Sequence, residues 1–268
     1  MTRMKGGELI ADYLVQEKVP FIFGICGHGN VGFLDALYDR KDKIQLISPR
    51  HEQCAGHMAD AYFRVKHRPV ATLTSTGPGS ANMVMSLATA LVDSSAFLAI
   101  TSNIPTSQHN RGPFQELYAH NQADFAQVMR PVVKRSFQPS RVDMLPLALR
   151  QAMDTMVTGR PGPVNLDVPY NLYQEEDDVE LPAPSHVHCA HRPGASDEDV
   201  AQAVSLLKQA RQPVIFIGHG ATLSEAGAEI QELAERLSIP VITSPNGMGC
   251  IPGDHPLALG FIGRNGAY

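Results

Sequence analysis

Cysteine is scarce in this sequence, and its spacing excludes a disulfide framework. The four cysteines, Cys26, Cys54, Cys189 and Cys250, are far apart and form no CxxC pair. Such a pattern indicates a reducing compartment rather than a small secreted domain held by disulfides. The run HVHCAH (residues 186–191) could suggest a metal cluster, but it lies in a proline-rich stretch without a second ligand group at structural-zinc spacing. We therefore expect a solvated linker there and no metal site.

The sequence also lacks an excess of positive charge and long apolar runs. Its 22 lysines and arginines against 27 aspartates and glutamates give a net charge of −5, which argues against a nucleic-acid partner. No apolar run approaches the length of a membrane span. The first twenty residues have no signal-peptide core. They have instead the pattern of an amphipathic helix. We expect a cytoplasmic protein with neither a nucleic-acid nor a membrane partner.

What the sequence does contain is a regular alternation of strand and helix patterns. Short apolar runs typical of buried strands occur at residues 20–25, 44–48, 69–75, 96–102, 131–137 and 162–169. Helical patterns lie between them, at 32–40, 51–66, 80–93 and 142–158, with small and apolar residues repeating on one face. This alternation predicts an α/β fold in which a mostly parallel sheet carries helices on both faces.

The alternation stops once and then resumes, which predicts two domains. Residues 1–175 form the first. Residues 176–196 are acidic and then rich in proline and histidine, without periodicity, and are typical of an interdomain linker. Residues 197–268 begin a second α/β (Rossmann-like) domain with two helical and two strand patterns, which we expect to be incomplete because two strands are too few for an α/β layer.

Glu52 stands where one apolar run has ended and the helical pattern 51–66 begins. The simpler interpretation is a solvated helix N-terminus, where the helix dipole favours an acid. Two observations favour chemistry instead. The residues that follow, Cys54, Ala55 and Gly56, are small and leave room for a ligand, and the strand-to-helix end of an α/β unit is where ligands usually bind. A carboxylate pressed against an apolar partner there can exchange protons.

Three loops rich in glycine or small residues accompany Glu52. They lie at residues 23–33, 74–82 and 112–125, each after a strand pattern. Because the carboxyl ends of parallel strands meet at one edge of a sheet, we expect these loops to share a ligand cleft. His28, at the tip of the first loop, is either a proton carrier or a solvent-exposed bystander.

The common nucleotide-binding motifs are absent. The turn TSTGPGSAN (residues 74–82) has no P-loop lysine, so a phosphate cradle is the weaker interpretation. The run GICGHG (residues 24–29) contains glycines at the wrong spacing for GxGxxG. A dinucleotide-binding oxidoreductase, which would also fit the alternation, therefore ranks low.

Five segments in order give the chain a family resemblance. RHEQCAGHMADAYFR, TSTGPGSAN, VDSSAF, GPFQE and GRPGPVNLDVP resemble segments of the thiamine-diphosphate enzymes of the acetolactate-synthase type. The resemblance covers residues 4 to about 173, as a pyrimidine-binding domain, and residues 197–268, as the first half of the central domain. Each segment alone is weak, but the five in this order are specific.

The resemblance implies a catalytic role for Glu52. In the family this carboxylate bonds N1′ of the cofactor aminopyrimidine, which activates C2 of the thiazolium to attack a carbonyl, usually of a 2-keto acid. C–C bonds are then cleaved or formed through a C2 carbanion/enamine. Further implied positions are Cys26, Gly27, Pro78 and Asn82 at the pyrimidine, and Phe114, Gln115 and His28 at the substrate, with Gln115 and His28 also taking part in catalysis.

The resemblance also implies cofactors and partners beyond the pyrimidine site. Arg160 matches a position that touches FAD in the flavin-bearing members, which makes FAD a candidate cofactor. The family holds Mg²⁺ and the diphosphate through a GDG…N segment on a C-terminal domain, and these 268 residues contain no such segment. We therefore expect this chain alone to be inactive. A homodimer or homotetramer is implied, because family active sites lie between subunits.

Departures from the family pattern leave other products open. The run GHGNV is closer to cyclic diketone hydrolases, and RPVVKRS is closer to a 2-keto acid decarboxylase. Both remain alternatives to an acetolactate-synthase-like reaction. A non-catalytic binding module of the same fold is the alternative from another class, and the presence of Glu52 argues against it.

Overall fold

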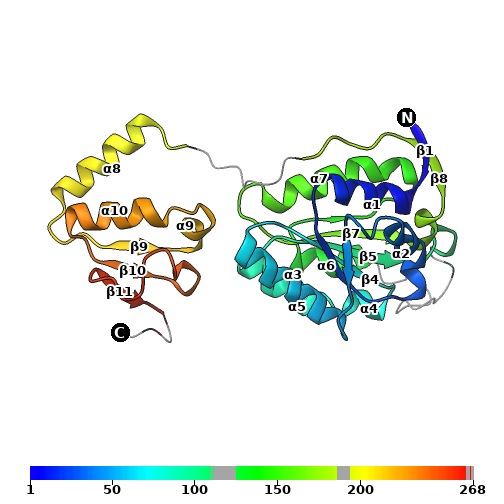
Figure 1. Ribbon diagram of the computed structural model, residues 1–268, viewed down its shortest axis with the longest axis horizontal. Helices are drawn as coiled ribbons and strands as arrows, with labels where there is room; N and C mark the ends of the chain where they lie inside the picture. Colours follow the sequence, from blue (N-terminus) through cyan, green and yellow to red (C-terminus); the bar gives the residue numbers. More distant parts are fainter. Residues whose placement is uncertain (110, 112–124, 186–193, 264–265, 267–268) are drawn as a thin grey trace. The chain divides into compact units, whose positions relative to one another are not determined.

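The chain divides into two units, Met1–His191 and Arg192–Tyr268. The computed structural model in Figure 1 describes all residues except 110, 112–124, 186–193, 264–265 and 267–268. The run at 186–191, expected to be a linker without metal, lies outside the described residues. The two units are treated separately below.

A six-stranded sheet forms the centre of the first unit. Its order is β3-β2-β4-β5-β7-β6, and every neighbouring pair is parallel. All residues of β4, β5 and β7 are buried, as expected for strands covered on both faces. The α/β prediction is thereby confirmed. The strands are β2 (Phe21–Gly24), β3 (Gln45–Ile47), β4 (Ala71–Thr74), β5 (Leu98–Asn103), β6 (Ser136–Phe137) and β7 (Val164–Pro169).

Helices cover both faces of this sheet. Helix α1 packs against α2 and α7, whereas α3 packs against α5. Figure 1 shows α1 and α7 on one side of the strands and α3 and α5 on the other. The helices are α1 (Gly6–Gln16), α2 (Val31–Tyr38), α3 (Glu52–Lys66), α4 (Pro78–Ala81), α5 (Val84–Val92), α6 (Phe125–Met129) and α7 (Leu145–Val157). Short 3₁₀ turns are η1 (His28–Asn30), η2 (Thr106–Gln108), η3 (Arg130–Val132), η4 (Val142–Met144) and η5 (Tyr170–Tyr173).

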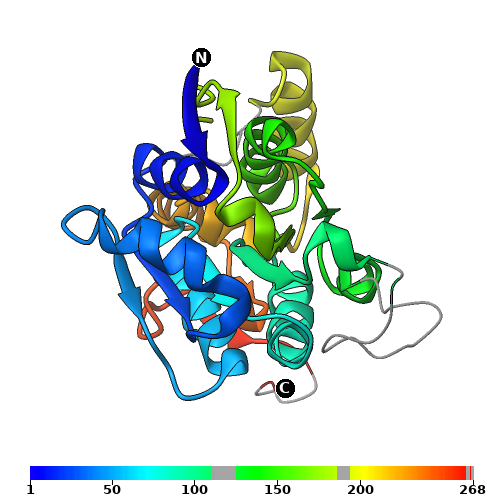
Figure 2. The same cartoon turned by 90° about the vertical axis from the view of Figure 1, so that its right-hand side faces the viewer.

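The local patterns misplace three segments of the first unit. The helix expected from the first residue begins at Gly6, because Thr2–Lys5 form strand β1, antiparallel to β8 (Glu176–Val179) inside the expected linker (Figure 2). The strand expected at 131–137 is only the two residues of β6. The helix after the glycine turn is split into α4 and α5. The pairing of β1 with β8 joins residues far apart in sequence, which a local pattern cannot reveal.

The second unit contains a three-stranded parallel sheet of order β11-β10-β9. Its small core consists of buried residues from the strands, α10 and the segment after β10: Ile217, Ala234, Val241, Cys250 and Ile251. The elements are α8 (Asp197–Gln209), β9 (Ile215–Ile217), α9 (His219–Leu223), α10 (Gly227–Leu237), β10 (Val241–Thr243), η6 (Pro245–Gly247) and β11 (Ala258–Phe261). Strand β11 was not expected from the sequence.

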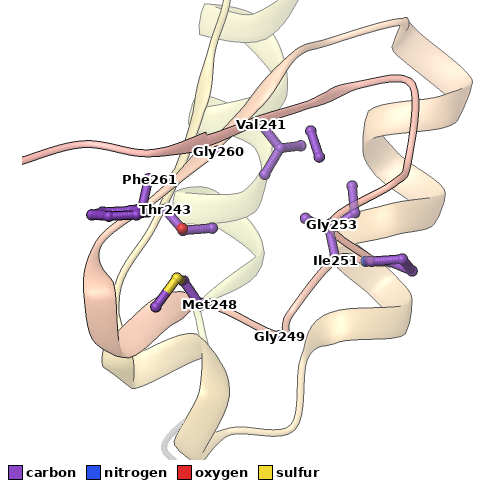
Figure 3. A pocket seen from close by; sticks show the side chains of 10 residues that line it. Val241, Thr243, Met248, Gly249, Ile251, Gly253, Gly260 and Phe261 are labelled. Carbon is purple, nitrogen blue, oxygen red and sulfur yellow. The ribbon is translucent and has the colours of Figure 1, made fainter. Parts of the chain in front are cut away.

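A cavity of about 320 Å³ lies in the second unit, between β10, β11 and the segment 248–253 (Figure 3). Thr243 supplies the one polar side chain of its lining, and the rest of that lining is apolar or glycine. None of the candidate residues from the sequence lines it. With a single hydroxyl, the cavity offers packing surface rather than acid–base chemistry.

The contact between α3 and α5 depends on Gly56. A Cβ at residue 56 would lie 2.5 Å from Ser86 Cβ and still closer to Ser86 Oγ. We expect Gly56→Ala to lower the free energy of unfolding by about 1–3 kcal/mol, because overpacking separates the helices. Denaturant unfolding followed by circular dichroism measures this change. Adding Ser86→Gly should recover part of the loss, and strictly additive effects of the two substitutions would contradict this account.

Candidate functional site

Cys26, Gly27, His28, Glu52 and Pro78 lie where the strand order reverses. From β2 the chain passes to β3 on one side and later to β4 on the other, so β2 and β4 are neighbours whose following segments run apart. Such a switch point at the carboxyl edge of a parallel sheet is where α/β proteins usually bind ligands. The segments after β2, β3 and β4 carry, in order, Cys26–His28, Glu52 and Pro78.

Glu52 is the first residue of α3 and is half-buried. The helix begins there because His51 has extended backbone angles, and its Nδ1 accepts a hydrogen bond from the Gln53 N–H over 3.2 Å. Asn82 Nδ2 donates to Glu52 Oε2 over 2.9 Å. Two residues that the sequence assigned to one ligand are therefore in direct contact, although Glu52 begins α3 and Asn82 follows α4.

The far end of α3 is held by an ion-pair network. Arg64 donates to both carboxylate oxygens of Asp60, which is on the same helix, and to Asp93, which follows α5. Asp60 is buried, and its hydrogen bond, followed by that of Asp93, raises the pKa of Arg64 against the opposing effect of burial. Helix α3 is therefore fixed to the α5 region by Arg64 and by the Gly56 contact, which limits the movement of Glu52.

The turn after β4 brings backbone close to the Glu52 carboxylate. Gly77 has a positive φ of 54°, which favours glycine, and Pro78 begins α4 directly after it. A Cβ at Gly79 would lie 3.2 Å from Glu52 Oε1, so a side chain there would crowd that oxygen. Ser80 Oγ donates to the Ser75 carbonyl and fixes the turn from within.

The segment after β2 packs against the same turn. A Cβ at Gly27 would lie 2.5 Å from Ser75 Oγ, and the Gly29 N–H donates to that hydroxyl over 3.3 Å. The Asn30 side chain is fully buried and bridges two backbone groups of the same segment. It accepts a hydrogen bond from the Gly27 N–H and donates one to the Ile25 carbonyl. The glycines therefore serve close packing of two loops, with Ser75 between them.

Two expected residues of the first loop point away from the protein interior. Cys26 is an exposed free thiol, and His28 is exposed with its ring edge-on to Tyr170 at 5.9 Å between centroids. Below them, Tyr173 is buried and stacks on Phe33, and burial raises the pKa of its hydroxyl. His28 therefore has a defined neighbour at the rim of the switch point and is accessible to a ligand.

Arg160 lies apart from the other candidates. Its guanidinium donates to Ser94 Oγ over 2.7 Å and to the backbone carbonyls of Leu91 and Val92, where α5 ends. Helix α5 ends just before β5 begins, so Arg160 is at the amino edge of the sheet, opposite the edge that carries Glu52. In this structure Arg160 caps a helix. Phe114 and Gln115 lie outside the described residues.

Sequence reasoning missed three residues that shape the site: His51, Ser75 and Asn30. Asn30 follows Gly29 and Ser75 comes two residues before Gly77, both within the loops already singled out, and their polar side chains near such turns were the available signal. His51 gave little signal, because histidine is not among the preferred helix caps.

The described part of the chain offers a carboxylate and neutral donors, without a metal centre. Among described residues no group of three or more His, Cys, Asp or Glu side chains is placed to hold a metal ion, and no described helix has the length and apolarity of a membrane span. Such a site can orient a heterocycle and hold or accept a proton at an oxygen of Glu52.

Comparison with known proteins agrees with this geometry. Residues 4–125 match the family described as "thiamine pyrophosphate enzyme, N-terminal TPP binding domain", and residues 200–268 match its central domain. The chain belongs to the thiamine pyrophosphate enzymes. The family resemblance seen in the sequence is thereby confirmed, and the switch-point residues lie within the N-terminal match.

Relatives of this thiamine pyrophosphate enzyme chain are acetolactate synthase subunits. It is 38% identical to the probable acetolactate synthase large subunit of Methanocaldococcus jannaschii, over 98% of this chain and 44% of that protein. It is 33% identical to the acetolactate synthase large subunit of Corynebacterium glutamicum, over 98% of this chain and 41% of that protein. It is 31% identical to the large subunit of acetolactate synthase isozyme 1 of Escherichia coli, over 98% of this chain and 45% of that protein. The chain thus spans less than half the length of these relatives.

Asn30 gives a direct test of the loop architecture. We expect Asn30→Ala to lower the free energy of unfolding by about 1–3 kcal/mol, because the fully buried Asn30 side chain is the partner of two part-buried backbone groups, the Gly27 N–H and the Ile25 carbonyl. Urea unfolding of the chain measures it. Asn171→Ala is the matched control, since Asn171 is only part-buried and water can replace its contacts with Thr106 and Glu175. Equal losses in the two variants would contradict the account.

Proposed function

We propose that this chain supplies the pyrimidine-binding part of a thiamine-diphosphate-dependent enzyme of the acetolactate-synthase type, acting on a 2-keto acid. The observation that carries the proposal is the placement of the Glu52 carboxylate at the switch point. One of its oxygens accepts from Asn82, and the other faces Gly79. The acetolactate synthase relatives support the reaction class.

The residues present fit the aminopyrimidine half of the cofactor. Gly79 has no side chain to crowd Glu52 Oε1, and Gly27 packs directly on Ser75, so no side chain of these two residues stands in the way of a ring. Glu52 would hold a proton at the ring nitrogen, and Pro78, which is exposed beside it, would limit the ring position. When bound, the cofactor supplies an electron sink at the carbonyl carbon of the substrate.

The substrate side is assigned by resemblance. Phe114, Gln115 and His28 would contact the 2-keto acid, and His28 is exposed as this role requires. A 2-keto acid decarboxylase or a cyclic diketone hydrolase remains the alternative reaction, because the GHGNV and RPVVKRS segments depart from the acetolactate synthase pattern.

Other features of the complete protein belong to the same proposal. Residues 1–175 are the pyrimidine-binding domain, 176–196 the linker and 197–268 part of the central domain. Mg²⁺ and the diphosphate are held by residues outside this chain, so these 268 residues alone do not turn over substrate. The enzyme is a cytoplasmic homodimer or homotetramer. FAD would involve Arg160 only if that side chain left its contacts at the end of α5.

Binding of the free pyrimidine tests the function on this chain alone. The probe is 4-amino-5-hydroxymethyl-2-methylpyrimidine, titrated into the labelled chain and followed by NMR. We expect resonances of Glu52, Ser75, Gly79 and Asn82 to shift, and Glu52→Gln to weaken binding at least about tenfold, or about 1.4 kcal/mol. The carboxylate is needed because its negative charge stabilises a protonated ring nitrogen. The neutral amide of glutamine does not.

Glu175→Gln is the matched control for this experiment. Glu175 is an exposed carboxylate that also accepts from an asparagine, Asn171, over 2.8 Å. This control should bind the probe as the parent chain does. Equal affinity of parent and Glu52→Gln chains would refute the pyrimidine site. In the complete enzyme, Glu52→Gln should reduce kcat by more than about tenfold, the same 1.4 kcal/mol of barrier.

A further inference from the structure

The two oxygens of the Glu52 carboxylate have different surroundings. Oε2 accepts a hydrogen bond from Asn82 Nδ2 over 2.9 Å. Oε1 lies 3.2 Å from the point that a Cβ of Gly79 would occupy. A carboxylate free to rotate would offer either oxygen to a ligand, whereas this arrangement distinguishes them.

The Glu52–Asn82 pair is supported one helical turn further on. Asn82 stands between α4 and α5, and its backbone N–H donates to the Pro78 carbonyl over 3.1 Å. Residues four apart lie on one helix face, so Gly56 lies below Glu52. Gly56 meets Ser86, which is four residues after Asn82. The close approach at Gly56 and Ser86 therefore sets the separation at which Asn82 reaches the carboxylate.

The chemistry of residue 82 matters as much as its position. A carboxamide N–H is a neutral donor. It can hydrogen-bond to a carboxylate oxygen without neutralising the negative charge of the carboxylate. An aspartate at the same place would set two carboxylates against each other. An alanine would leave Oε2 to water and the carboxylate free to turn.

We propose that Asn82 is a positioning residue, and that Glu52 Oε1 is the atom that bonds the pyrimidine ring nitrogen. This inference rests on the proposed function. Asn82 occupies Oε2 and fixes the carboxylate plane, and Gly79 keeps the space beside Oε1 open. The residue expected from resemblance to touch the pyrimidine thus acts on it through Glu52.

The first measurement tests the contact itself, without ligand. In the ¹⁵N-labelled chain, the side-chain amide resonances of Asn82 should move when Glu52 is changed to alanine. Those of Asn171 should stay unchanged in that variant and should move in Glu175→Ala, because Asn171 donates to Glu175 in the same way. An Asn82 amide that does not respond to Glu52→Ala overturns the inference.

The second measurement compares affinity for the same free pyrimidine. Asn82→Asp should weaken binding at least about tenfold, and Asn82→Ala should weaken it less. Gly79→Ala should also weaken binding while leaving the Asn82 amide resonances in place, because it crowds Oε1 and not Oε2. Asn171→Asp serves as the matched control and should bind as the parent chain does.

A charge-swapped double variant tests the Glu52–Asn82 contact through stability. Glu52→Gln with Asn82→Asp restores an amide–carboxylate hydrogen bond with the charge on the other residue. The unfolding midpoint lost in Asn82→Asp should therefore recover, while pyrimidine binding stays weakened at least tenfold, because Glu52→Gln alone removes the carboxylate that bonds the ring. An unfolding midpoint that does not recover overturns the inference.

The outcomes distinguish this inference from the function on which it rests. If the parent and Glu52→Gln chains bind the pyrimidine equally, the proposed function fails, and the inference fails with it. If Glu52→Gln loses binding while Asn82→Asp and Asn82→Ala bind as the parent does, the function stands and the role of Asn82 is overturned. Parallel losses, with an unaffected Asn171→Asp control, support both.

Discussion

The reversal of strand order at β2 is the constraint on which the candidate site depends. Because β3 lies on one side of the β2–β4 pair and β5 on the other, the chain leaves β2 and β4 in opposite directions at the carboxyl edge. Close packing then sets the distances between the segments at this edge, through Gly27 on Ser75 and Gly79 beside Glu52. Burial of the central strands makes this frame rigid, so a single carboxylate can be held in place.

Glycine has two different structural roles around this site. At Gly77 it provides a backbone conformation with positive φ, which starts the turn into α4. At Gly27, Gly56 and Gly79 it removes side-chain bulk where two segments meet. The half-buried carboxylate of Glu52 meets a neutral donor, the Asn82 carboxamide, at the place where these close contacts bring α3 toward the end of α4.

The sequence predicts the parts of the structure that local patterns determine. Buried strands, the start of α3 near Glu52 and the glycine turns can all be found from short periodicities and from residue types. The contact between Glu52 and Asn82 could not, because it depends on how closely α3 approaches α5, and that depends on Gly56 and Ser86. The role of Arg160 toward FAD stays a prediction, and the structure adds that its guanidinium bonds the end of α5 at the amino edge of the sheet.

The pairing of β1 with β8 bears on how the chain is made. The register joins Thr2 to Val179 and Lys5 to Glu176, so Thr2–Lys5 has no partner strand until almost the whole first unit has been synthesised. Until then Thr2–Lys5 is an open edge, with backbone groups available to any passing strand. The positive charges of Arg3 and Lys5 hinder such pairing before β8 is present. In the folded protein Arg3 forms an ion pair with Glu176 of β8.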